Sequence, residues 1–94
     1  MNFNEWSAIS SDEQKERCQS LNPYQDWGLF KDIEEAFIKQ HGSQPGVEKV
    51  FCGIGSGLGP LNAITVTIKR GEKRVQVPKI FMGFPVLLES KRGG

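Results

Sequence analysis

Two β-rich runs on either side of a glycine-rich segment constrain the fold of this chain most. In the second run, Ile64, Val66 and Ile68 alternate with Thr65 and Thr67. Because successive side chains of a strand point to opposite faces, one face of this strand is apolar and the other is polar. That alternation is typical of an antiparallel sheet with one buried face. The segment between the runs has glycine at alternate positions from 53 to 59 and proline at 60, so we expect it to connect the two strands.

The composition indicates one small globular domain. Of the 94 residues, 37% are hydrophobic and 24% are charged, proportions that distinguish the chain from disordered proteins. The net charge is only +1, but residues 1–46 hold four Lys/Arg and eight Asp/Glu, whereas residues 47–94 hold eight and three. We therefore expect attraction between the two halves, or a partner whose charge is complementary to one of them.

Residues 1–21 are expected to form a peripheral helical segment. A short helical turn at 4–9 precedes a helix over about 12–20, whose start matches a capping box with Ser10 as the N-cap and Glu13 three residues later. This helix is almost entirely polar, so we expect it to lie outside the core.

A second and stronger helix is expected from about Asp26 to Gln40, after a turn at Asn22-Pro23. The acidic residues at 32, 34 and 35 fall on its exposed side. Apolar residues at helical spacing form the opposite stripe, which consists of Phe30, Ile33, Phe37 and His41, widened by Trp27 and Ile38.

The rest of the chain is expected to complete a sheet. A short third strand at 74–77 ends at Pro78, which has no N–H for the ladder. Residues 79–84 read as an apolar crossover to a last strand at 86–89, and residues 90–94 as a polar tail.

These elements predict a single α+β domain over residues 1–94. Two N-terminal helices precede a three- to four-stranded antiparallel sheet, and the second helix packs on that sheet within residues 22–89. The predicted core consists of Phe30, Ile33, Phe37, Val50, Ile54, Ile64, Val66, Ile68 and Val86.

No residue pattern points to catalysis, to a cofactor or to a metal. The glycine segment lacks the spacing of a dinucleotide-binding loop, and a strand follows it, so no helix N-terminus would face a phosphate. The single histidine, His41, is expected to interact with the dipole at its helix end rather than to act as a base. Cys18 and Cys52 lack metal-ligand spacing and are expected to be buried and reduced. We therefore expect a protein without enzymatic activity.

The N-terminal residues show no basic stretch followed by an apolar run, and no stretch is long enough to span a membrane. We therefore expect a cytosolic protein without a membrane partner.

Basic residues gather at the turn that follows the alternating strand. Nucleic-acid binding by the basic turn Lys69–Arg74 is therefore one interpretation, although aromatic residues do not interleave with these charges. The outward positions of the strand and the basic residues after it are the expected partner-binding residues: Thr65, Thr67, Lys69, Arg70, Lys73 and Arg74.

The leading interpretation is a small protein-binding module of inhibitor, immunity or regulatory type. Its partner would be another protein or a second copy of the chain. A third interpretation comes from Gly93-Gly94, which resembles the tail of ubiquitin-like modifiers and sulfur carriers. Their domain opens with a hairpin and places its helix afterwards, whereas two helices come first here.

The second half of the chain holds five different short apolar motifs, in this order: Gly46-Val47, Gly53-Ile54-Gly55, Ala63-Ile64-Thr65-Val66, Val77-Pro78 and Gly83-Phe84-Pro85-Val86. Their order over residues 46–89 resembles a small α/β segment that precedes some bacterial trypsin-like peptidase domains. Because these 94 residues include no peptidase domain, the resemblance implies no peptidase chemistry. It implies a helix followed by an antiparallel sheet, in a module that serves another protein.

Overall fold

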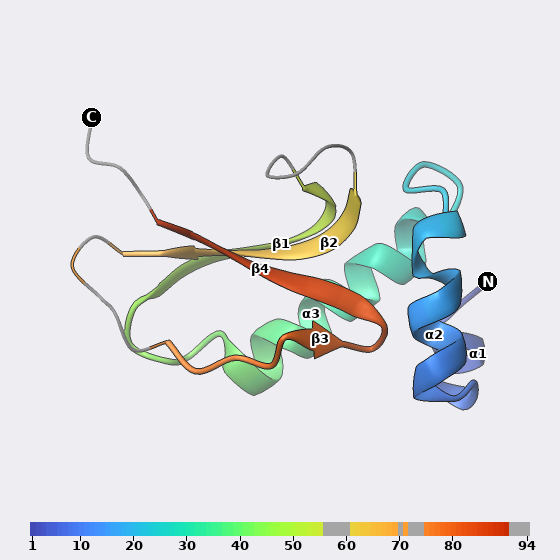
Figure 1. Cartoon of the computed structure of the whole chain (residues 1–94), viewed down its shortest axis with the longest axis horizontal. Helices are drawn as coiled ribbons and strands as arrows, with labels where there is room; N and C mark the ends of the chain where they lie inside the picture. Colours follow the sequence, from blue (N-terminus) through green and yellow to red (C-terminus); the bar gives the residue numbers. More distant parts are fainter. Residues whose placement is uncertain (56–60, 70, 72–74, 91–94) are drawn as a thin grey trace.

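The computed structural model describes residues 1–55, 61–69, 71 and 75–90 and shows an α+β fold (Figure 1). The N-terminal helices lie at one end of the molecule, beside the turn that joins the last two strands. In chain order, the elements are α1 (Phe3–Ala8), α2 (Ser11–Arg17), the short 3₁₀ helix η1 (Cys18–Ser20), α3 (Trp27–His41), β1 (Val47–Gly55), β2 (Leu61–Ile68), β3 (Ile80–Phe81) and β4 (Phe84–Ser90).

The four strands form a mixed sheet in the order β1-β2-β4-β3. β1 pairs with β2 in antiparallel orientation, with Cys52 opposite Ile64, whereas β4 runs parallel to β2, with Val86 opposite Ile64 on the other side. The prediction of a wholly antiparallel sheet was therefore wrong. Parallel neighbours need a crossover, which here starts after Ile68 and returns the chain through β3.

The expected strand at 74–77 is not a strand in its described part, residues 75–77. Instead, the backbone of Gln76 pairs with one side chain. Gln44 Nε2 donates to the Gln76 carbonyl at 2.7 Å, and the Gln76 N–H donates to Gln44 Oε1 at 3.1 Å. The Gln44 amide thus replaces a neighbouring strand and fixes the crossover to the loop before β1.

A tight hairpin stands where an apolar crossover at 79–84 was expected. β3 and β4 pair in antiparallel orientation around Met82 and Gly83, whose φ angles are 51° and 87°. Two consecutive positive φ angles match the twist of a two-residue hairpin. A side chain at Gly83 would also meet α2, because a Cβ there would lie 2.5 Å from the carbonyl carbon of Gln14.

Aromatic pairs hold the helices to the strands. On α3, Phe30 contacts Phe84 edge to face with ring centroids 5.2 Å apart. Phe37 contacts Phe81 in the same way, also at 5.2 Å, and Trp6 of α1 reaches Phe84 at 6.0 Å. Edge-to-face contacts add to the stabilisation by burial because the positive edge of one ring meets the negative face of the other.

The N-terminal segment is not peripheral. Trp6 and Cys18 are fully buried and belong to the same core cluster as α3 and the strands. The Trp6 indole donates to the Met82 carbonyl at 2.9 Å, and Gln14 Nε2 donates to the Trp6 carbonyl at 2.8 Å. α1 and α2 therefore clamp the β3–β4 turn.

Most predicted core residues are buried or partly buried. Ile54, however, is exposed, as are Trp27 and Ile38, which were expected to widen the apolar stripe of α3. The expected burial of Cys18 and Cys52 is confirmed. Other large buried side chains were not among the predicted core residues: Trp6, Leu29, Phe81 and Phe84.

We predict that Phe37→Ala lowers the free energy of unfolding by about 3–5 kcal/mol, because the substitution leaves a cavity in the core and removes the ring contact with Phe81. Ile38→Ala is the matched control, since Ile38 is the next residue on α3 and is exposed. Urea unfolding measures both variants. Equal, small losses would contradict the docking of α3 described above.

Comparing Gly83, in the β3–β4 turn, with Gly71, which lies before β3, distinguishes the cost of backbone strain from the cost of a steric overlap. Gly71 and Gly83 have nearly the same φ, 89° and 87°, but a Cβ at Gly71 would meet no atom of the described residues within 4 Å. Gly71→Ala should therefore cost roughly 1–2 kcal/mol from strain alone. Gly83→Ala should cost at least about 1 kcal/mol more, because the methyl group overlaps the backbone of Gln14. Equal losses in urea unfolding would show that α2 does not press on this turn.

Candidate protein-binding site

The structure places only part of the predicted partner surface. Thr65 and Thr67 are half-buried and lie on the face of β2 opposite to the buried Ile64, and Lys69 is exposed just after the strand. Within the described residues, Thr65 Oγ1 is a buried side-chain oxygen without a hydrogen-bond partner. Arg70, Lys73 and Arg74 lie outside the described residues, as does Gly93-Gly94.

A groove of about 230 Å³ runs between the start of α3 and the end of β1, and we call it the aromatic groove. Figure 1 shows the loop before α3 on the same side of the molecule as the end of β1 and the start of β2. The lining residues carry no charge. They are Pro23, Tyr24, Trp27, Phe30, Phe51, Cys52, Gly53 and Ile54.

Exposed apolar side chains gather at this groove. Among the described residues, eight large hydrophobic side chains are exposed, and half of them line the aromatic groove. Single exposed hydrophobic residues are normal, but a contiguous group marks a binding surface. The four residues and their exposed fractions are Tyr24 at 85%, Trp27 at 60%, Phe51 at 45% and Ile54 at 46%.

Hydrogen bonds to Asn22 shape the loop that presents Tyr24. Asn22 Oδ1 accepts from the N–H groups of Tyr24 and Gln25, at 2.8 and 3.2 Å. The Asn22 N–H donates to Asp26 Oδ2 at 3.1 Å, and the N-terminal amine lies 3.7 Å from Asp26 Oδ1. An asparagine side chain that bonds to the following N–H groups makes a turn of defined shape. The loop therefore holds Tyr24 outward by its backbone rather than by packing.

Asn62 ties the chain before this loop to the sheet. Its side-chain amide donates to the carbonyls of Cys18 and Leu21, at 3.0 and 2.8 Å. In return, the Gln19 side chain accepts from the Asn62 N–H and donates to the Asn62 carbonyl, both at 2.9 Å. Because Asn62 is the β2 residue opposite Ile54, this network holds the loop beside the end of β1.

Two local contacts place the rings of the groove. The ring of Phe51 lies over Gly53, where a Cβ would be 2.6 Å from the Phe51 Cζ, so a larger residue at Gly53 would displace the ring. Lys31 Nζ lies 4.9 Å from the centroid of the Trp27 ring, a cation–π contact that favours one orientation of the exposed indole.

Glu34 was expected on the exposed side of its helix, but its side chain is largely covered. Glu34 Oε1 accepts from the Cys52 N–H at 3.1 Å, and Oε2 lies 3.5 Å from Lys31 Nζ. Since β1 is an edge strand, a carboxylate in this place occupies a backbone donor that another strand would need.

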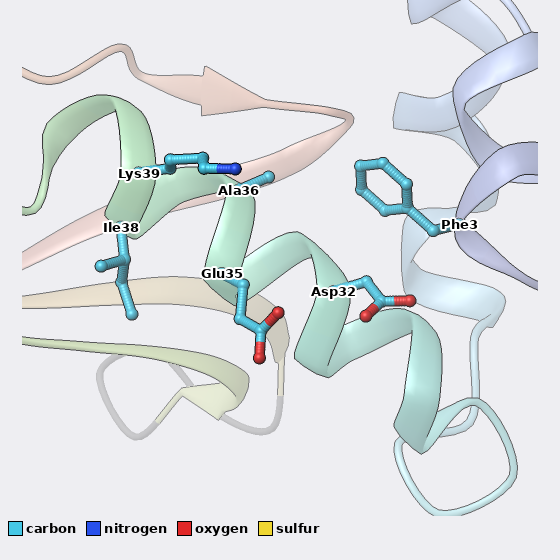
Figure 2. A pocket seen from close by; sticks show the side chains of 6 residues that line it. All are labelled: Phe3, Asp32, Glu35, Ala36, Ile38 and Lys39. Carbon is cyan, nitrogen blue, oxygen red and sulfur yellow. The ribbon is translucent and has the colours of Figure 1, made fainter.

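A second hollow, of about 460 Å³, lies between α1 and the outer side of α3. In Figure 2, the ring of Phe3 and the carboxylate of Asp32 point toward the space between the two helices. Glu35 and Lys39 bring charges of both signs to the lining, which Ala36 and Ile38 complete. Phe3 is the one aromatic residue in this lining, whereas four aromatic residues line the first groove.

The groups considered for chemistry are buried or packed. His41 ends α3 with its ring 4.9 Å from that of Phe37 and 6.1 Å from that of Phe81. Burial raises the pKa of the Cys18 thiol to about 12. Burial raises the pKa of the Cys52 thiol further, with smaller contributions from Glu34 and Cys18. Both thiols are free and stay protonated at neutral pH, so neither is an activated nucleophile.

Within the described ranges, no group of three or more His, Cys, Asp or Glu residues could hold a metal ion. No helix in that part of the chain is long and apolar enough to cross a membrane.

No protein-family model, curated protein or solved structure matches the chain. The resemblance of residues 46–89 to a segment before bacterial peptidase domains therefore stays a prediction.

The raised pKa values of Cys18 and Cys52 predict a loss of stability at high pH. Both groups keep their proton in the folded state above the pH at which the unfolded chain releases it, about 8.5. Their contribution to the free energy of unfolding is complete below that pH and falls as the pH rises toward 12, by about 2 kcal/mol per thiol between pH 8 and pH 10. Urea unfolding at the two pH values should show a smaller loss for Cys18→Ala/Cys52→Ala than for the wild type. Equal losses would contradict the burial of the thiols.

Proposed function

We propose that this chain is a non-enzymatic, cytosolic protein-binding module of inhibitor, immunity or regulatory type, and that the aromatic groove binds its partner. The observation that carries the proposal is the grouping of Tyr24, Trp27, Phe51 and Ile54, all exposed, around one groove. Aromatic residues are enriched at protein interfaces because each buries a large area with few rotatable bonds.

The bonds that hold the backbone around the groove support the proposal. The Asn22 turn and the Asn62 network hold the loop by its backbone, and Lys31 holds the Trp27 ring. Side chains that are ordered before binding lose little conformational entropy when a partner arrives, so more of the contact energy contributes to affinity. A groove built in this way suits recognition better than a mobile loop with the same residues.

The partner in this proposal is another protein or a second copy of the chain. The uneven charge of the two halves of the chain would orient either partner as it approaches, since the acidic first half attracts a basic surface. Nucleic-acid binding by the basic turn Lys69–Arg74 has less support, because the acidic first half of the chain would repel a polyanion.

Affinity capture from extracts of the source cells tests the proposal. We expect the wild type to retain a protein in stoichiometric amount, and Tyr24→Ala/Trp27→Ala to lose it. The matched control is Ile80→Ala/Leu88→Ala, which removes two exposed apolar side chains outside the groove and should retain the protein. Light scattering shows whether that protein is a second copy. Equal retention by both variants would contradict the groove as the binding site.

A further inference from the structure

We infer that the aromatic groove binds a proline-rich segment of its partner in the extended polyproline II conformation. This inference rests on the proposed function and names the chemistry of the occupant. Three features of the groove carry it: its rings, its free hydrogen-bond donors, and the occupied backbone donor at the edge of β1.

The rings suit the side chains of such a segment. Pro23, Tyr24, Trp27 and Phe51 line one groove of about 230 Å³, so flat apolar surfaces stand close together. Proline rings are compact and rigid, and a polyproline II helix loses little entropy on binding because φ is already fixed. Aromatic-lined grooves are the general solution for recognising such segments.

The hydrogen-bond donors suit the backbone of such a segment. Among the described residues, neither the Tyr24 hydroxyl nor the Trp27 indole N–H has a hydrogen-bond partner. A proline-rich backbone has carbonyl acceptors but few N–H donors, and polyproline II forms no internal hydrogen bonds. The groove offers donors to a segment that brings acceptors.

The charge of the groove sets a further condition on the occupant. None of the lining side chains is charged, so a Lys, Arg, Asp or Glu that entered the groove would lose hydration without meeting an opposite charge among the lining residues. The lining therefore favours an uncharged segment for the stretch in contact, which proline satisfies.

The alternative occupant, an extended strand added to β1, meets an obstacle. Strand addition uses the free N–H and C=O groups of a sheet edge. The N–H of Cys52 already donates to Glu34, whose other oxygen is paired with Lys31. An added strand would have to displace this carboxylate, whereas a polyproline II segment that contacts rings and side-chain donors would not.

Titration with a synthetic decaproline peptide tests the inference, with Trp fluorescence as the readout. Trp6 is fully buried, so a change in emission on binding reports on the exposed Trp27. We expect saturable binding, and we expect Tyr24→Phe, which removes only the hydroxyl donor, to weaken it. Trp27→Ala should weaken it by at least about tenfold in a label-free titration, whereas Ile80→Ala should leave it unchanged.

A peptide of alternating threonine and valine, equal in length, is the comparison probe for strand addition. Binding of this peptide in place of decaproline would overturn the inference. Binding of neither peptide at millimolar concentration would also overturn it. The proposed function would still stand in both cases if affinity capture depends on Tyr24 and Trp27, and it would fail with the inference if capture does not.

Discussion

The hydrogen bonds of Asn62 are the interaction on which the arrangement of this molecule depends. They join the first residues of β2 to the chain that leads into α3, and the Gln19 side chain completes the junction by pairing with the Asn62 backbone. Buried polar groups must be paired, so the position of this chain segment has little freedom. The aromatic groove depends on this position, because its two sides are the chain that leads into α3 and the end of β1, where Ile54 lies opposite Asn62.

Side-chain amides replace a strand at two places in this small fold. Gln44 pairs with the backbone of Gln76 in the same reciprocal way as Gln19 pairs with Asn62. At the other end, Trp6 donates to the turn carbonyl of Met82 while its ring packs on Phe84. A domain of this size has few residues for a core, so such specific bonds fix segments that apolar burial alone would leave loosely placed.

The local patterns predicted the helix over α3, the alternation in β2 and the burial of Phe30 and Phe37 because each depends on neighbours in the chain. The parallel pairing of β4 depends instead on the β3–β4 turn and on Trp6, which is 76 residues away from Met82. Helical spacing put Trp27 on the apolar stripe of its helix, but its side chain is exposed. The Asn22-Pro23 turn before α3 was visible in the sequence, but its role in presenting Tyr24 was not.

The side-chain amide of Asn62 gives the most direct test of this account by NMR. Its two protons should exchange slowly with water and show nuclear Overhauser effects to Cys18 and Leu21, since they donate to these carbonyls. The side chain of Gln25, which is exposed and without a hydrogen bond among the described residues, is the internal reference for fast exchange. Equal exchange for the two amides, with no effect between Asn62 and these residues, would contradict the claim that Asn62 holds the groove together.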